Sequence, residues 1–88
     1  MKYNYILLYT AGFTNFIVVF KEPVSEQTYQ RARSDVGSVG GQVTNEYHHS
    51  LKGFAVELPD GFVNTFQNKP YIEYIEKDEE GKRILSYT

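Results

Sequence analysis

Two short apolar runs constrain this chain more than any other feature. Residues 16–20 read Phe-Ile-Val-Val-Phe, an unbroken β-branched and aromatic segment that stops at a Lys-Glu-Pro break at 21–23. Such a run is typical of a strand buried on both faces. Residues 51–58 predict a second strand, on which Gly53 and Ala55 share one unusually flat face. We expect a sheet built around these two strands.

Helix signals follow each of the two runs. The segment after Val24 predicts an amphipathic helix with Ser25 as its N-cap and Gly37 as its C′ residue. A second helix is expected after the Pro-Asp-Gly turn at 59–61, with Asp60 as its cap. Its apolar residues are Phe62, Val63 and Phe66.

Two further segments predict strands. Residues 42–48 alternate, with Val43, Asn45 and Tyr47 on one face, as in a half-exposed strand. Residues 71–78 predict the last strand, but its two isoleucines, at 72 and 75, have opposite parity. That spacing requires either a bulge or partial cover of both faces.

The resulting order is strand, helix, strand, strand, helix, strand, which indicates an α+β fold. In 88 residues, of which 41% are hydrophobic, it predicts one domain with a four-stranded antiparallel sheet and both helices on one face. The first and third strands then lie in the middle. The opposite face would be open, and it would display Ile17 and Val19 beside Gly53 and Ala55. An uncovered apolar face is a candidate docking surface.

The composition excludes several classes of function. The chain has no cysteine, and its formal net charge of −2 does not suit a nucleic-acid binder with a basic face. His48 and His49 are neighbours on a strand, so their side chains point to opposite faces and do not predict a metal site. No nucleophile motif or phosphate-binding loop occurs. We therefore expect no enzyme activity, no cofactor, no metal and no nucleic-acid partner.

The two ends of the chain stand apart from the domain. We predict an N-terminal extension at 1–13, a domain at 14–78 and a flexible tail at 79–88. The apolar stretch at 5–9 weakly resembles a secretory signal, but an extra strand or an extension packed on the sheet suits its Tyr residues better. No run reaches the length of about 20 apolar residues that a membrane span needs. We expect a soluble, intracellular protein of the cytoplasm or vacuole.

Two carboxylates stand out on the last strand. Glu76 and Asp78 are two residues apart and point the same way as Tyr74. They are either ordinary solvated residues at a strand end or acceptors for the backbone N–H groups at a partner's helix N-termini.

Four motifs in order resemble a known family. Phe-Ile-Val-Val-Phe-Lys at 16–21, the Gly40-Gly41 turn, Leu-Lys-Gly-Phe-Ala-Val at 51–56 and Tyr-Ile-Glu-Lys-Asp at 74–78 are similar to the subtilisin propeptide-like inhibitors. This family includes subtilase pro-regions and free-standing fungal inhibitors of subtilisin and proteinase B. The resemblance covers about residues 14–78.

The resemblance implies a ferredoxin-like fold whose uncovered sheet face packs on two surface helices of a subtilisin-type protease. It implies that Glu76 and Asp78 cap those helices and that the C-terminal tail occupies the substrate cleft. Either Leu85 or Ile84 would fill the apolar pocket four positions before the scissile bond. The tail is longer than usual in the family, and the usual spacing would place Gly81 there. The tail residues concerned are Ile84, Leu85, Ser86, Tyr87 and Thr88.

These expectations describe a stand-alone inhibitor of subtilisin-like serine proteases that is monomeric when free. Two alternatives stay open. One is an excised subtilase pro-region that acts as an intramolecular chaperone. The other is a ferredoxin-like module that binds small ligands or nucleic acid.

Overall fold

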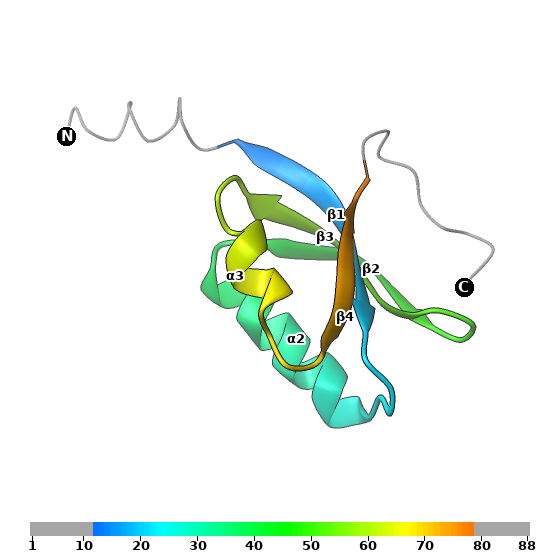
Figure 1. Cartoon of the computed structure of the whole chain (residues 1–88). Helices are drawn as coiled ribbons and strands as arrows, with labels where there is room; N and C mark the ends of the chain where they lie inside the picture. Colours follow the sequence, from blue (N-terminus) through cyan, green and yellow to red (C-terminus); the bar gives the residue numbers. More distant parts are fainter. Residues whose placement is uncertain (1–11, 79–88) are drawn as a thin grey trace, which may run out of the picture.

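A computed structural model describes residues 12–78, which form one four-stranded antiparallel sheet with two helices on one of its faces (Figure 1). The strand order is β2-β3-β1-β4. The predicted α+β, ferredoxin-like class is therefore confirmed, with the first and third strands in the middle. The elements are β1 (Phe13–Phe20), α2 (Glu26–Ser38), β2 (Gln42–His48), β3 (Lys52–Pro59), α3 (Val63–Gln67) and β4 (Ile72–Lys77).

The main core lies between the sheet and the two helices. In the central pair, Phe16 lies opposite Val56 and Val18 opposite Phe54, so these side chains share the helix-facing side. Tyr29 of α2 and Phe66 of α3 pack onto them. The buried members of this cluster are Val18, Phe20, Tyr29, Ala32, Val36, Phe54, Val56, Leu58, Phe66 and Ile72.

A smaller cluster lies on the opposite side of the sheet, which we call the outer face. It joins Ile17, Tyr47 and Ala55, with Val19 and Leu51 packed against them. The prediction that the flat residues of this face are exposed is wrong: Ile17 and Ala55 keep only 4% and 7% of their accessible surface. One reason is that Tyr47 packs against both of them, a contact that the sequence pattern did not indicate.

The ends of α2 are fixed by two different devices. Ser25 is the N-cap as predicted, and its backbone N–H donates to Thr28 Oγ1 at 3.2 Å. The predicted C′ residue is wrong, because Gly37 lies inside the helix and Gly40 has the left-handed φ of +82°. Gly40 N–H donates to Gly37 O and Gly41 N–H donates to Val36 O, which is a Schellman motif.

Each edge strand contains an irregularity. In β4 the register shifts so that Val19 pairs with Tyr74 and Phe20 with Ile72, which leaves Glu73 as the extra residue. The predicted bulge is thus confirmed, and Ile72 and Ile75 both join the helix-side core.

The irregularity in β2 was not predicted. The register skips Thr44, whose hydroxyl donates to the Ala55 carbonyl at 3.1 Å. Val43 consequently packs on the helix side while Tyr47 lies on the outer face, so the predicted common face for these two residues is wrong.

Asp60 also differs from its predicted role. The N-cap of α3 is Phe62, without a side-chain capping bond, and α3 is only five residues long. The Asp60 carboxylate instead accepts a hydrogen bond from Thr14 Oγ1 at 2.8 Å, and its backbone N–H donates to the Gly12 carbonyl. This turn ties the start of β1 to the end of β3.

Candidate docking face

The outer face brings together the residues that the sequence singled out on three strands. Ile17 of β1 lies between Ala55 of β3 and Glu76 of β4. Val19 lies between Gly53 and Tyr74 in the same way. Because side chains alternate along a strand, these neighbours point to one side of the sheet.

Gly53 gives the face its flat centre for a steric reason. A Cβ atom at this position would lie 1.9 Å from the carbonyl oxygen of Val18 and 3.1 Å from Val19 Cα. Strands β1 and β3 therefore approach closely at a place where a larger residue cannot stand. Gly53, which the sequence pattern singled out, is thus required by the close packing of β1 and β3.

Glu76 lies at the edge of this face near the end of β4, and Asp78 comes directly after that strand. Glu76 is exposed and neighbours Ile17 across the strand pair. Asp78 follows the strand, and its backbone N–H donates to the Asn15 carbonyl at 2.8 Å. That bond fixes the position along β1 at which the chain leaves the sheet.

Two aromatic residues on this face are exposed, and neither was predicted to contact a partner. Tyr74 keeps 47% of its surface and Phe13 keeps 56%. Tyr74 is the partner of Val19, and Phe13 has the same parity as Ile17 at the other end of β1. Because β1 was predicted to begin at Phe16, Phe13 was not assigned to the strand. The alternation of Phe13 with Ile17 could have indicated that both lie on the same face.

An open hollow of about 560 Å³ lies at the Tyr74 end of the face. Its apolar wall consists of Val19, Leu51 and Tyr74, which come from three different segments. Charged groups surround it, and the Lys52 ammonium lies 3.8 Å from the Glu22 carboxylate. The remaining lining residues are Phe20, Lys21, Ser50 and Glu73.

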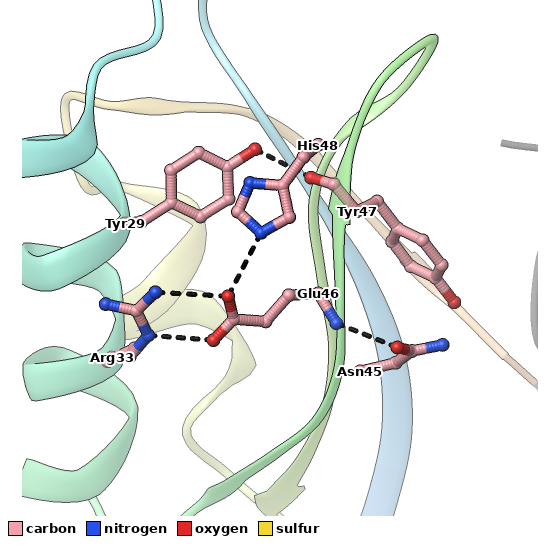
Figure 2. Close-up of polar contacts among 6 residues, drawn as sticks. All are labelled: Tyr29, Arg33, Asn45, Glu46, Tyr47 and His48. Atoms are coloured by element: carbon pink, nitrogen blue, oxygen red, sulfur yellow. Dashed lines mark hydrogen bonds and ion pairs between the residues drawn. The ribbon is translucent and has the colours of Figure 1, made fainter. Parts of the chain in front are cut away.

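A polar cluster between α2 and β2 holds the strand that carries Tyr47. Figure 2 shows the side chains of Arg33, Glu46 and His48 between the two elements, with the Tyr47 ring on the other side of β2. Arg33 donates two hydrogen bonds to Glu46, at 2.7 and 3.1 Å, and His48 Nε2 lies 3.2 Å from the same carboxylate. The hydrogen bond from Arg33 is the main reason that the pKa of Glu46 lies below its ordinary value.

Tyr29 completes this attachment. Its hydroxyl donates to the Tyr47 carbonyl at 2.6 Å, and its ring is stacked with that of His48 at 4.3 Å between centroids. Burial raises the pKa of the Tyr29 phenol, with a smaller contribution from the Glu46 carboxylate. The cluster consists of internal contacts and therefore has a structural role, in holding β2 against α2.

The remaining predicted residues lie outside the part that the structure describes. These are residues 1–11 of the predicted N-terminal extension at 1–13 and the whole predicted tail at 79–88, including residues 84–88. Within residues 12–78, no three His, Asp or Glu side chains gather as metal ligands would. Neither described helix has the length and apolar character that crossing a membrane requires.

Comparison with known proteins gives a consistent result. The family model described as peptidase inhibitor I9 matches residues 15–83. Serine proteinase inhibitors IA-1 and IA-2 of Pleurotus ostreatus are 41% and 39% identical to this chain, each over 66 residues that cover 72% of it and 87% of the relative. An uncharacterized protein of Schizosaccharomyces pombe, C338.12, is 30% identical over 75% of this chain and 86% of its own length. The chain belongs to the peptidase inhibitor I9 family.

Proposed function

We propose that this protein is a stand-alone inhibitor of subtilisin-like serine proteases. The observation that carries the proposal is its membership of an inhibitor family together with two relatives named as serine proteinase inhibitors. These relatives are inhibitors and not enzymes, which agrees with the absence of a nucleophile motif in this sequence.

The protease docks on the outer face of the sheet. Ile17, Val19, Gly53 and Ala55 adjoin one another at its flat centre, where Ile17, Gly53 and Ala55 are buried in the free protein and Val19 is partly exposed. The exposed Tyr74 supplies an apolar contact at the margin. A sheet face of this shape suits two packed helices of a partner.

Glu76 and Asp78 accept hydrogen bonds from the N-termini of those helices. In support, Glu76 is exposed at one edge of the face, and Asp78 follows it by two residues. A carboxylate at a helix N-terminus contributes about 0.3–1 kcal/mol, and up to about 2 when partly buried. Two of them together are expected to strengthen binding by about 5- to 140-fold, for about 1–3 kcal/mol.

The tail from residue 84 onward lies in the substrate cleft as an extended strand. Its backbone adds to the exposed edges of the protease and its side chains enter alternate pockets. Either Leu85 or Ile84 fills the distal apolar pocket. This assignment supports inhibition without a strained reactive bond, since the docked face keeps the product-like tail in place.

Titration of a subtilisin, with trypsin as the comparison, tests the proposal. We expect inhibition of subtilisin at or below micromolar protein and none of trypsin. Deletion of residues 84–88 should abolish inhibition while the far-ultraviolet circular dichroism spectrum stays unchanged. Absence of subtilisin inhibition by the full chain would overturn the function, and full inhibition by the truncated chain would overturn the role of the tail.

A charge-matched pair of variants tests the carboxylates separately. Glu76→Ala with Asp78→Ala removes two negative charges from the docking face. Glu26→Lys changes the net charge by the same two units at an exposed position, the first residue of α2. Only the first variant should weaken binding, and equal affinities would make the carboxylates of β4 ordinary solvated groups.

A further inference from the structure

One end of the sheet brings together three segments that are far apart in the sequence. β1 lies between β3 and β4, so the start of β1 is flanked by the end of β3 on one side and by the end of β4 on the other (Figure 1). Phe13 lies opposite Pro59 of β3, and Phe16 lies opposite Lys77 of β4. Contacts made by the first residues of β1 can therefore affect both neighbouring strands.

Asp60 makes two contacts with this end of β1, which we call the Asp60 clamp. Its backbone N–H donates to the Gly12 carbonyl at 2.9 Å, and its carboxylate accepts a hydrogen bond from Thr14 Oγ1 at 2.8 Å. Pro59, the last residue of β3, has no N–H, so Asp60 supplies the next donor toward β1. A hydrogen bond to a charged acceptor is also stronger than one between neutral groups.

The residue at position 12 shows how closely the clamp fits. A Cβ atom on Gly12 would lie 2.7 Å from Asp60 Oδ2, a distance that real Cβ contacts essentially never show. Because Oδ2 is at the end of a side chain that can rotate, a larger residue at position 12 would push the carboxylate away. Glycine thus leaves room for the carboxylate beside Thr14.

The other side of β1 holds the last residue that the structure describes. Asp78 N–H donates to the Asn15 carbonyl at 2.8 Å, one position beyond the pair of Phe16 with Lys77. Asn15 follows Thr14 directly, so about 3.3 Å of strand separates the clamped residue from the residue that holds Asp78. Strand ends open locally without unfolding of the whole domain. Loss of the clamp would let the start of β1 open and would weaken the bond to Asp78.

We propose that Asp60 is a positioning residue for inhibition and that it acts through β1. It holds the start of β1 against β3, and β1 in turn fixes Asp78 at the end of β4. The inference rests on the proposed function, because Asp78 and the segment after it are the groups that we propose to contact the protease. A protease docked on the outer face then meets a segment whose first residue is already held, which lowers the conformational entropy lost on binding.

Hydrogen exchange in the free protein tests the first step. Exchange of the Asp78 amide, followed by NMR, reports local opening at the end of β4, which a change in the stability of the whole domain does not alter. We expect Asp60→Ala to exchange this amide about 3- to 10-fold faster, as for the loss of one hydrogen bond. Asp60→Asn keeps an oxygen that can accept from Thr14 and should restore slow exchange.

Two variants of β1 test the clamp from the opposite side. Thr14→Val removes the hydroxyl that donates to Asp60, and Gly12→Ala pushes the carboxylate away. Both should speed exchange at Asp78, and Thr14→Val should add little to Asp60→Ala because the two changes remove the same bond. Glu26→Ala, which removes a carboxylate at the start of α2, is the matched control and should leave the exchange unchanged.

Inhibition of subtilisin tests the second step. We expect the inhibition constant to rise several-fold for Asp60→Ala and to stay at the wild-type value for Asp60→Asn. Thermal unfolding checks that each variant is folded, and Thr14→Val replaces Asp60→Ala if the latter is not.

Each outcome decides the proposal. Unchanged exchange at Asp78 in Asp60→Ala overturns the clamp, and faster exchange with unchanged inhibition overturns its role in positioning. If the wild-type chain inhibits no subtilisin, the proposed function fails and the positioning role fails with it. Inhibition by the wild type that Asp60→Ala retains in full overturns the positioning role alone.

Discussion

Replacing Gly53 by alanine tests the close approach of β3 to β1. The added Cβ atom would lie 1.9 Å from the Val18 carbonyl oxygen, whereas real Cβ contacts essentially never fall below 3.0 Å. The two strands must therefore separate by at least the difference, 1.1 Å, at this point. That displacement falls on the Val19 to Gly53 pair in the centre of the sheet.

The cost follows from overpacking and from a weakened ladder. Overpacking of a tight site costs about 1–3 kcal/mol. A buried backbone group that loses its hydrogen bond costs about 1–3 kcal/mol. We expect Gly53→Ala to lower the free energy of unfolding by about 3 kcal/mol, which for a domain of this size lowers Tm by about 12–24 °C.

Thermal unfolding followed by circular dichroism measures this loss, and Gly37→Ala is its control. Gly37 lies in α2 with no atom within 4 Å of an added Cβ. Alanine there should raise the free energy of unfolding by about 0.5–1 kcal/mol, because glycine is a poor helix former. The reasoning fails if Gly53→Ala unfolds at the wild-type temperature.

Three further predictions concern the contacts of α2. Tyr29→Phe leaves the buried Tyr47 carbonyl without its 2.6 Å partner and should cost about 1–3 kcal/mol in urea unfolding, so an unchanged midpoint would contradict the role of that hydroxyl. The depressed pKa of Glu46 contributes stability above its ordinary value of 4.5 that is lost as pH falls below it; Arg33→Gln should flatten this acid dependence of Tm, and parallel curves would refute it. Burial raises the pKa of Tyr71 above its ordinary value of 10.0, so stability should fall as pH rises past 10, and Tyr71→Phe should remove part of that fall.

The fold could be predicted because its signals are local and repeated. The apolar run of β1 and the N-cap Ser25 each act through their immediate neighbours, and the structure has both. The bulge in β4 was indicated by the parity of Ile72 and Ile75, since only an extra residue lets both face the helices. Patterns of this kind depend only on residues that are close together in the sequence.

The structure differs from the sequence-based prediction at two kinds of position. In one, two neighbouring glycines could each end a helix, and in the other, segments distant in sequence are in contact. Gly37 and Gly40 both suit a helix end, and the hydrogen bonds from Gly40 and Gly41 decide between them. Asp60 is a residue type that suits a helix N-cap, but its carboxylate accepts a hydrogen bond from Thr14, which is distant in sequence. The burial of the outer face also depends on Tyr47, whose orientation follows from an irregularity that no local pattern of β2 revealed.

The interruptions in β2 and β4 also bear on how the free chain behaves at high concentration. These are the two edges of the sheet, where unpaired backbone groups can accept a strand from another molecule. Thr44 and Glu73 each break the regular row of donors and acceptors at one edge, and exposed charges such as Lys77 add repulsion. Both edge strands are thus poor templates for aggregation, which is a physical reason to expect a monomer.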